Sequence, residues 1–218
     1  MIYTDFHGEK LSLLGFGTMR LPLVPGGGPA DIDEKTTADM VRYAMDHGVN
    51  YFDTAYPYHG GMSERVIGRV LKDYDRQSFY LATKYPGHQI SDSYDPAAIF
   101  EEQLQKCGVE YFDFYLMHAQ GLTNYDHFKA CQAYETAFAL KAEGKIRHVG
   151  ISFHDRAEVL EQILTDYPYI EVVQLQFNYL DYDDPAVQSR RCYEVCCRHN
   201  KPVLVMEPAK GGSLVNLP

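Results

Sequence analysis

Two residues in the first third of the chain could do acid–base chemistry together. Asp53 follows a short apolar run at 51–52, and Tyr58 comes five residues after it, in a loop rich in Tyr, His and Gly. If the apolar run is a buried strand, the carboxylate of Asp53 lies at the strand end and the phenol of Tyr58 lies one short loop away. Such a pair could hold and transfer a proton, although an aspartate at a strand end more often only caps a turn. Ser63 follows this loop and is predicted to be the N-cap of a helix.

Other polar residues that could take part in chemistry also follow short apolar runs. They are Lys84, His118, Ser152, Gln174 and Glu207. The runs are continuous rather than alternating, which is typical of strands that are buried on both faces. Each residue has a simpler explanation when it is taken alone, because a lysine at a strand end is usually solvated and a histidine there is usually a hydrogen-bonded structural residue.

The apolar runs alternate with segments of helical pattern. Strands are predicted at 13–19, 51–52, 79–83, 112–117, 148–151, 172–175 and 203–206, after an N-terminal hairpin at 1–12 that turns at 7–8. Helices are predicted at 33–47, from 63, from 95 to 108, at 125–143, at 155–165 and at 184–199. Strands that alternate with helices in this way form a parallel sheet.

Two parallel architectures fit this alternation, the open doubly wound sheet and the closed eight-stranded barrel. No G-x-G-x-x-G motif follows a strand, which counts against a dinucleotide-binding doubly wound domain. In a barrel, the polar residues at the strand ends meet at one mouth, where barrel enzymes keep their active sites. We therefore predict an α/β fold, a (β/α)8 TIM barrel of which about seven strands are present and the eighth strand and closing helices are missing.

The composition narrows the class of protein. The chain has 218 residues, enough for one domain over 1–218, and a formal net charge of -10 without a cluster of Lys and Arg. Nucleic acid is therefore not expected as the main partner, because phosphate binding needs a basic surface. No apolar segment approaches the length that spans a bilayer and no signal peptide is expected, so we predict a cytoplasmic protein without a membrane partner.

Metal chemistry is not indicated by the cysteines or histidines. The five cysteines are odd in number and unevenly spaced, which indicates reduced thiols. Cys192 and Cys196 would share one face of a helix and could bind a metal together, but thiols on an apolar helix face are the favoured interpretation. The nine histidines include no H-x-H or H-E-x-x-H spacing, so a metal hydrolase is not expected. Without a C-x2-C-x2-C tract, no iron–sulfur cluster is indicated.

A set of short motifs occurs at the predicted strand ends and loops. They are GFGTM at 15–19, FDTA at 52–55 with Tyr58, ATK at 82–84, YLMH at 115–118, GKIR at 144–147, VGIS at 149–152 and Gln174. Each motif alone is only suggestive, but in this order, from about 13 to 214, the set resembles the aldo-keto reductase family. The segments SFHD at 152–155 and MEPAKGG at 206–212 are most similar to its bacterial and archaeal branch, whose longer members often carry a C-terminal iron–sulfur domain.

The resemblance implies a barrel that transfers hydride between a nicotinamide dinucleotide and a carbonyl compound or an alcohol. The family's four catalytic positions correspond to Asp53, Tyr58, Lys84 and His118. Tyr58 would give the proton to the carbonyl oxygen, and the Lys84 cation would lower the Tyr58 pKa from its ordinary value of about 10. Asp53 would hold Lys84 in place. His118 would donate a hydrogen bond to the carbonyl oxygen and orient the substrate.

The resemblance also implies which residues bind the cofactor, which is usually NADP(H), with NAD(H) possible. Ser152 and Gln174 would hold the nicotinamide carboxamide, and Met206 would lie against the nicotinamide ring. The remaining cofactor positions are Gly17, Thr18, Met19 and Asp53 at the mouth, and Pro208 and Lys210 near the pyrophosphate. His59 stands where many members have glycine, so the loop after Tyr58 is expected to differ in shape.

The predicted function is the NADPH-dependent reduction of a small aldehyde or ketone to an alcohol. Because Pro218 comes directly after the seventh strand and its loop, we expect a C-terminally truncated chain. A non-catalytic fragment that acts only as a binding or assembly module is therefore an alternative. Another is a barrel enzyme that uses Lys84 as a Schiff-base nucleophile. The sequence indicates neither the physiological substrate nor the oligomeric state.

Overall fold

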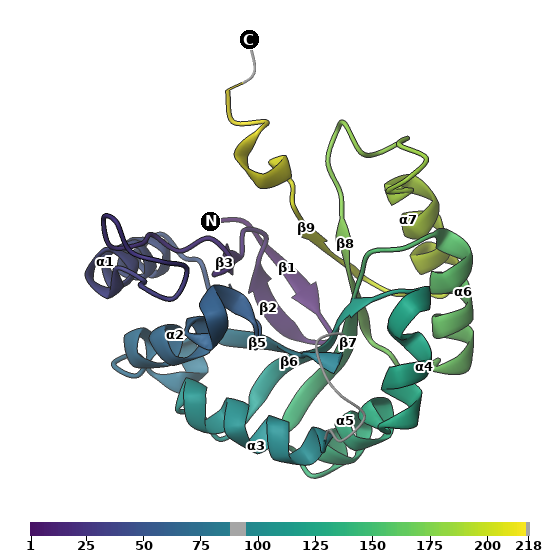
Figure 1. The fold of residues 1–218 in the computed structure, drawn as a ribbon, viewed down its shortest axis with the longest axis horizontal. Helices are drawn as coiled ribbons and strands as arrows, with labels where there is room; N and C mark the ends of the chain where they lie inside the picture. The colour runs from purple at the N-terminus through teal and green to yellow at the C-terminus, as the bar shows by residue number, and fades with distance from the viewer. Residues whose placement is uncertain (88–94, 217–218) are drawn as a thin grey trace.

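The central feature of the fold is a parallel sheet of seven strands. The structure, a computed structural model, describes residues 1–87 and 95–216. The strands follow one another across the sheet in chain order, each parallel to its neighbour, and the sheet curls around its inner face (Figure 1). They are β3 (Phe16–Gly17), β4 (Tyr51–Asp53), β5 (Tyr80–Tyr85), β6 (Phe112–Gln120), β7 (Ile146–Phe153), β8 (Val172–Gln176) and β9 (Val203–Met206).

Helices cover the outer face of this curled sheet (Figure 1). They are α1 (Glu34–Asp46), α2 (Ser63–Leu71), α3 (Pro96–Cys107), α4 (Leu122–Ala130), α5 (Ala133–Ala142), α6 (Ala157–Asp166) and α7 (Ser189–Arg198), with short 3-10 turns η1 (Tyr58–Gly61), η2 (Arg76–Ser78) and η4 (Lys210–Gly212). The predicted α/β fold with seven strands of a barrel is therefore confirmed as a curled half-barrel. In the described part of the chain, β3 and β9 are its two edges, and no helix there has the length and apolar character needed to cross a membrane.

Each strand turns its side chains alternately to the inside and the outside of the curled sheet. On β5, Ala82 packs in an inner cluster, whereas Leu81 packs in the larger cluster between the sheet and the helices. On β6, Leu116 belongs to the inner cluster. Lys84 lies two residues after Ala82, and His118 lies two residues after Leu116. Both therefore share the inner side of the sheet, at its C-terminal end.

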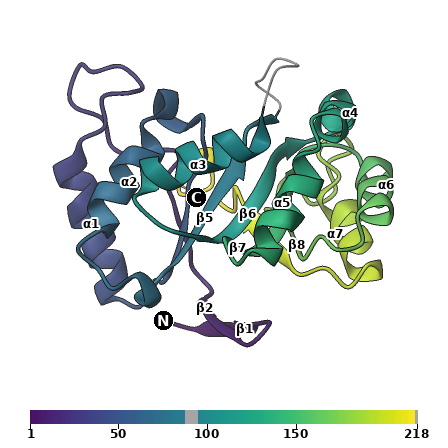
Figure 2. The ribbon, with the colours of Figure 1, turned by 90° about the horizontal axis from the view of Figure 1, so that it is seen from below.

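An antiparallel hairpin covers the other end of the barrel interior (Figure 2). Its strands are β1 (Tyr3–Phe6) and β2 (Glu9–Ser12). Phe6 and Leu11 are buried in the inner cluster, and Oε2 of Glu9 lies 3.3 Å from Nε2 of His148 near the start of β7. The predicted hairpin with its turn at 7–8 is confirmed. Because the hairpin closes the N-terminal ends of the strands, the C-terminal ends are left to form a site.

The first strand of the parallel sheet is shorter than predicted. A strand is expected over 13–19, but β3 contains only two residues. Leu13 instead donates its backbone N–H to the carbonyl oxygen of Ile2 at 2.9 Å, and the side chains of Leu13 and Leu14 are exposed. The segment before β3 therefore extends the pairing of the hairpin, and this pairing competes with the parallel sheet for the same backbone groups.

One predicted helix is divided in two. The pattern predicts a single helix over 125–143, but the chain forms α4 and α5 there. Gln132, which lies between them, has a φ of 57°, the left-handed conformation that ends a helical run. Both segments still place apolar side chains in the outer core, through Phe128 and Leu140 for example, so the apolar pattern alone could not reveal the break.

The last predicted helix begins later than expected. A helix is predicted over 184–199, but α7 begins only at Ser189. Asp184 does cap a structure, because its Oδ1 accepts the backbone N–H of Ala186 at 2.8 Å, but that structure is a local turn. Gln188, with a φ of 54°, then separates the turn from the helix.

The helices α2 and α3 approach each other closely at a glycine. A Cβ atom at Gly68 would lie 2.5 Å from the carbonyl oxygen of Cys107 and 2.7 Å from its Cα atom. Gly68→Ala is therefore expected to push the helices apart and to lower the free energy of unfolding by about 1–3 kcal/mol. Chemical denaturation measures this loss. Gly28→Ala, where the nearest atom would lie 3.7 Å away, is the matched control. A Gly68→Ala protein as stable as the wild type would contradict this tight packing.

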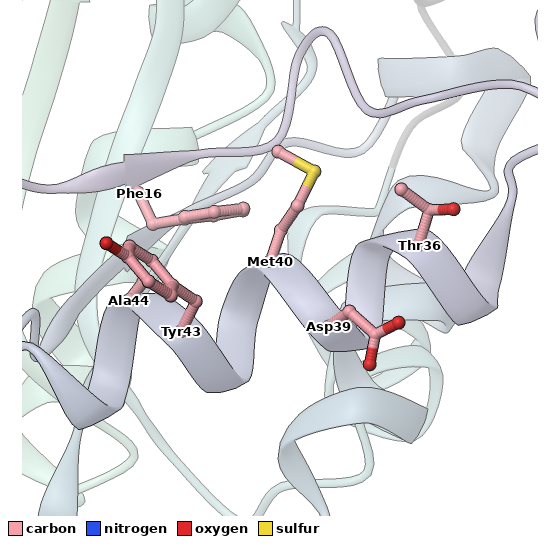
Figure 3. A pocket seen from close by; sticks show the side chains of 6 residues that line it. All are labelled: Phe16, Thr36, Asp39, Met40, Tyr43 and Ala44. Carbon is pink, nitrogen blue, oxygen red and sulfur yellow. The ribbon is translucent and has the colours of Figure 1, made fainter.

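A shallow apolar groove lies between β3 and α1, on the helix-covered side of the sheet (Figure 3). Its lining residues are Phe16, Thr36, Asp39, Met40, Tyr43 and Ala44. None of them is a residue that the sequence predicts to do chemistry. The groove therefore does not serve as the candidate site, which lies on the inner side of the sheet.

Candidate active site

Lys84 is the centre of the buried polar residues at the C-terminal ends of the strands. It lies on β5, opposite Leu116 of β6, and its side chain is 1% exposed. Its Nζ donates hydrogen bonds to the Asp53 carboxylate at 2.6 Å, to the carbonyl oxygen of Thr54 at 2.8 Å and to the hydroxyl of Tyr58 at 3.2 Å. An ammonium group has three donors, so Lys84 is fully hydrogen-bonded although it is buried.

Asp53 connects this centre to two other parts of the sheet. Its Oδ2 accepts a hydrogen bond from Nε2 of Gln174 on β8 at 3.0 Å. Its carbonyl oxygen accepts hydrogen bonds from the backbone N–H and the hydroxyl of Thr18, at 2.9 and 3.0 Å. Because β4 and β8 are not neighbours in the sheet, the bond from Gln174 crosses the barrel interior. The carboxylate is therefore held between Lys84 and Gln174.

Tyr58 is presented by the tight turn η1. His59, the next residue, has a φ of 54°, a left-handed conformation that favours glycine. The His59 ring is held on two sides, because Nε2 accepts the backbone N–H of Leu21 at 3.0 Å and Nδ1 lies 2.9 Å from the carbonyl oxygen of Pro29. His59 thus adopts the backbone shape of a glycine and also ties the Tyr58 turn to the preceding loop.

His118 completes the group of four residues that are predicted to be catalytic. It lies near the end of β6 and is 8% exposed. Its ring meets the ring of Tyr58 edge to face, with the centroids 5.7 Å apart and the planes at 76°. The structure therefore brings Asp53, Tyr58, Lys84 and His118 together, from β4, η1, β5 and β6. Their catalytic roles remain predictions.

The pKa of Tyr58 differs from the predicted direction. Burial raises the pKa of Tyr58 above its ordinary value, and the neighbouring Lys84 cation offsets only part of this increase. Lys84 therefore acts in the predicted direction, but burial outweighs it, and the Tyr58 pKa is raised rather than lowered. Burial alone would lower the pKa of Lys84, but Asp53 and Tyr58 together raise it above its ordinary value. The resulting cation argues against the Schiff-base alternative, because a lysine must be neutral to attack a carbonyl group.

Two residues that are predicted to hold the nicotinamide carboxamide lie side by side. Ser152 on β7 and Gln174 on β8 are partners in the parallel register. The Ser152 hydroxyl accepts the backbone N–H of Ala119 at 2.8 Å, so its proton can be donated to another acceptor. Gln174 donates to Asp53 and has an amide oxygen that can accept. A carboxamide needs one donor and one acceptor, and this pair fits both needs.

The remaining predicted residues at the mouth lie at both edges of the sheet. Thr18 is fully buried and donates hydrogen bonds to the carbonyl oxygen of Asp53. Gly17 and Met19, on either side of it, are exposed. Met206 is the last residue of β9, and the exposed Pro208 follows it. These positions leave Gly17, Met19 and Pro208 accessible to a ligand, while the side chain of Thr18 faces the protein interior.

Lys210 is held by a carboxylate that the sequence did not single out. Its Nζ donates to Oδ1 of Asp181 at 2.5 Å. Oδ2 of Asp181 accepts further hydrogen bonds from the side chains of Gln176 and Asn178, both at 2.6 Å. These hydrogen bonds lower the pKa of Asp181 to about 2. The bond from Lys210 has the largest effect, and those from Asn178 and Gln176 have smaller ones. The turn after β9 is therefore fastened to the loop after β8.

Ser63 does not cap α2, contrary to the prediction. The N-cap position is Met62, which forms no side-chain capping bond. Ser63 is fully buried, and its hydroxyl oxygen lies 2.7 Å from that of Thr18 and 2.9 Å from that of Thr54. The physical reason is that the first turn of α2 faces the strand ends rather than solvent. The hydroxyl therefore bonds to strand-end hydroxyls instead of the helix backbone.

Glu64 is a second buried polar residue that sequence reasoning missed. A signal for it exists in the sequence, because Glu64 lies three residues before Ile67 and seven before Leu71. At this spacing the three side chains share one face of a helix, and a carboxylate on an apolar face needs a specific partner. Glu64 is fully buried in the structure, and burial raises its pKa.

The cysteine pair on α7 lies within the apolar core. Cys192 and Cys196 are buried in the outer cluster, and burial raises their thiol pKa values to about 11 and about 12. This burial agrees with the interpretation of apolar-face thiols. Within 1–87 and 95–216, no group of three or more His, Cys, Asp or Glu side chains is placed to hold a metal ion.

Known proteins are similar to this sequence over much of its length. Residues 13–217 match the sequence profile of the Aldo/keto reductase family. The chain is 29% identical to the NADH-specific methylglyoxal reductase of Escherichia coli K12 over 94% of its length, and 33% identical to the aldo-keto reductase YhdN of Bacillus subtilis 168 over 70% of its length. It spans 65% of the first relative and 47% of the second.

Solved structures share the fold. An aldo/keto reductase from Klebsiella pneumoniae in complex with NADP and acetate is 26% identical, with a TM-score of 0.68 over 94% of this chain and 67% of that chain. An aldo-keto reductase from Bacillus halodurans in its holo form has a TM-score of 0.74 at 24% identity, over 100% of this chain and 70% of that chain. Because residues 13–217, nearly the whole of this chain, match the family profile, the chain belongs to the aldo/keto reductase family.

Proposed function

We propose that this chain carries the carbonyl-reducing centre of a nicotinamide-dependent oxidoreductase, with Tyr58 as the proton donor. The observation that carries this proposal is the Lys84 ammonium, which bonds both the Asp53 carboxylate at 2.6 Å and the Tyr58 hydroxyl at 3.2 Å. Membership of the family supports the reaction class, and the Escherichia coli relative is named a methylglyoxal reductase.

The proposed reaction adds a hydride to a carbonyl carbon and a proton to the carbonyl oxygen, which gives an alcohol. The cofactor, when bound, supplies the hydride. As negative charge develops on the carbonyl oxygen, the Tyr58 hydroxyl donates its proton to that oxygen. The phenolate that remains lies beside the Lys84 ammonium, whose positive charge stabilises it. Asp53 keeps Lys84 protonated and in place.

His118 is proposed to orient the substrate. Its ring lies against the ring of Tyr58 at the same strand ends. An imidazole N–H donated to the carbonyl oxygen would fix this oxygen next to the Tyr58 hydroxyl and would therefore favour proton transfer. The proposed substrate is a small aldehyde or ketone in the cytoplasm. A reducing compartment is supported by the five cysteines, all of which are free thiols.

For the cofactor we propose NADP(H), with NAD(H) as the second candidate. Ser152 and Gln174 supply the donor and acceptor for the carboxamide, which both dinucleotides carry. Met206, Pro208 and Lys210 follow on the neighbouring β9 and its loop, where they are proposed to border the nicotinamide ring and the pyrophosphate. Both cofactors occur among the similar proteins, since the Klebsiella structure is a complex with NADP and the Escherichia coli relative is named NADH-specific.

The first test is the binding of NADPH, followed through the fluorescence of the cofactor because the chain has no tryptophan. Saturable binding is expected. Gln174→Ala is expected to raise the Kd about 10-fold, because it removes a hydrogen-bonding partner of the carboxamide. Gln77→Ala is the matched control. It replaces an exposed glutamine in η2 at the opposite ends of the strands and should leave the Kd unchanged.

The second test is turnover with methylglyoxal and either NADPH or NADH. Turnover by the wild-type chain supports the reductase function. Binding without turnover on any of a panel of small aldehydes and ketones favours the alternative, a non-catalytic binding module. A folded chain that binds neither NADPH nor NADH would contradict the proposed function for this chain.

A further inference from the structure

The first turn of α2 places two polar side chains between the strand ends that carry Asp53 and Lys84. Ser63 and Glu64 are both 0% exposed. Burying a hydroxyl and a carboxylate side by side is unfavourable unless hydrogen bonds compensate for the lost water. The hydrogen-bond partners of these two residues therefore indicate their roles. The partners of Ser63 connect it to the end of β4, and those of Glu64 connect it to the end of β5.

Ser63 is the middle of a chain of buried hydroxyls. The Ser63 hydroxyl donates to Oγ1 of Thr18 at 2.7 Å and lies 2.9 Å from Oγ1 of Thr54. Thr18 in turn donates its hydroxyl proton to the carbonyl oxygen of Asp53 at 3.0 Å. These hydrogen bonds thus connect the Thr54 hydroxyl through Ser63 and Thr18 to the carbonyl oxygen of Asp53. Asp53 and Thr54 supply two of the three acceptors of Lys84, the Asp53 carboxylate and the Thr54 carbonyl oxygen.

Glu64 holds the end of β5 in the same manner. Its Oε1 accepts hydrogen bonds from the hydroxyl of Thr83 and from Nε2 of Gln103 on α3, both at 2.6 Å. Nε2 of Gln103 also donates to the carbonyl oxygen of Lys84 at 3.1 Å. Thr83 and Gln103 are fully buried. Glu64 therefore holds the side chain of Thr83 directly and the backbone of Lys84 through Gln103.

We propose that Ser63 and Glu64 are positioning residues, which fix the ends of β4 and β5 so that the Lys84 ammonium stays on the Asp53 carboxylate and the Tyr58 hydroxyl. The loop that carries Tyr58 begins at Asp53 and ends at the first turn of α2, so the same turn also anchors this loop. The effect on turnover rests on the proposed function, whereas the effect on the position of Lys84 does not.

The hydrogen bonds of Glu64, rather than its charge, carry this role. Oε2 of Glu64 has no hydrogen-bond partner within the described ranges. The Lys106 ammonium forms only a long ion pair with it, at 3.7 Å, and a closer one with Glu102, at 2.7 Å. Burial also raises the pKa of Glu64, because it disfavours the charged form of the carboxyl group. The positioning role therefore rests on the two hydrogen bonds that Oε1 accepts, and these form only if the side chain is long enough to reach Thr83 and Gln103.

Two substitutions of Glu64 distinguish the effect of its side-chain length from the effect of its charge. Glu64→Gln keeps an oxygen at the position of Oε1 and removes the charge, so kcat should stay near the wild-type value. Glu64→Asp keeps the charge but withdraws the oxygen by one methylene group, and kcat is expected to fall about 10- to 100-fold with little change in KM for the cofactor. Ser63→Ala should lower kcat in the same range. Glu102→Gln is the control, because Glu102 bonds to Lys106 and Tyr56 but not to Thr83, Gln103 or the Lys84 centre.

A second readout does not need turnover. Lysine labelled with 13C at the ε carbon gives an NMR signal for Lys84, assigned by its loss in Lys84→Arg, and its shift with pH reports the Lys84 pKa. If Lys84 moves away from Asp53 while it stays buried, its pKa is expected to fall by about one unit or more. The fall is expected in Glu64→Asp and Ser63→Ala but not in Glu64→Gln or Glu102→Gln.

The two readouts distinguish the possible failures. A Lys84 titration that is the same in Glu64→Asp and Ser63→Ala as in the wild type would overturn the positioning role, even if both variants lose stability. If Glu64→Asp does not fold, Ser63→Ala decides the question alone. A wild-type chain without turnover would refute the proposed function, while the NMR titration would still decide the positioning of Lys84.

Discussion

Tyr58→Phe is expected to lower kcat for carbonyl reduction about 100- to 10,000-fold while the cofactor Kd changes little. The substitution removes only the hydroxyl group. The Lys84 ammonium loses its acceptor at 3.2 Å but keeps the Asp53 carboxylate and the Thr54 carbonyl oxygen. The edge-to-face contact with His118 involves the ring and is retained. The loss therefore falls on proton transfer rather than on the fold of the site.

Steady-state kinetics with methylglyoxal measure kcat and KM separately for this variant. Tyr56→Phe is the matched control, because it lies in the same loop and its hydroxyl bonds to Glu102 at 3.1 Å rather than to the Lys84 centre. Its kcat should stay near the wild-type value. If Tyr58→Phe retained wild-type kcat, another group would have to supply the proton, and the role proposed for Tyr58 would be wrong.

The pH dependence gives a second check on Tyr58. Because burial raises the pKa of Tyr58 above its ordinary value, the phenol stays protonated at neutral and mildly alkaline pH. Reduction uses the protonated phenol, so its rate should not fall through loss of this proton between about pH 6 and about pH 9. Oxidation of the alcohol uses the phenolate as a base, so its rate should rise with pH, and Tyr58→Phe should remove this rise.

The convergence of the candidate site could be predicted because it follows from the sheet. Parallel strands in chain order bring their C-terminal ends to one edge, so residues that follow apolar runs must meet there. Asp53, Lys84 and His118 could therefore be assigned to one site without a structure. Tyr58 could be paired with Asp53 by its spacing, but it lies on a loop and has no strand to fix its place, so its assignment to the site depended on the motifs.

The roles of the supporting residues could not be predicted, because they depend on how separate elements face one another. The helical spacing of Glu64 indicates only that its carboxylate needs a buried partner. Ser63 is a good N-cap by local preference, and only the packing of α2 against the strand ends turns its hydroxyl away from the helix. The same holds for the pKa of Tyr58, which depends on the balance between burial and the charge of Lys84. Gln132 divides a helix by its backbone conformation, and no pattern of apolar residues records that conformation.

Lys84→Met is expected to abolish measurable turnover and to destabilise the fold. Without the ammonium, no cation stabilises the phenolate that forms on Tyr58 in the proposed reaction. Asp53, whose side chain is only 14% exposed, then loses its ionic partner and keeps the hydrogen bond from Gln174. Removing one partner of such a pair should lower the free energy of unfolding by about 2–4 kcal/mol. Chemical denaturation and kinetics on the same sample measure both effects.

A matched control is available at another buried lysine. The side chain of Lys106 is 5% exposed and bonds to Glu102 at 2.7 Å, but it belongs to α3 and not to the strand ends. Lys106→Met should therefore lower stability while turnover remains. If Lys106→Met lost turnover as completely as Lys84→Met, the loss would reflect a general weakening of the fold, and the specific role of Lys84 would be refuted.

The double variant Lys84→Met/Asp53→Asn separates the two roles of the ammonium. The neutral amide at 53 leaves no unpaired buried charge, so the double variant should be more stable than Lys84→Met alone. Turnover should nevertheless stay lost, because no positive charge lies beside Tyr58. If inactivity came only from destabilisation, activity would return together with stability. If the double variant regained turnover, Lys84 would serve only to neutralise Asp53, and the stabilisation of the Tyr58 phenolate would have to come from another group.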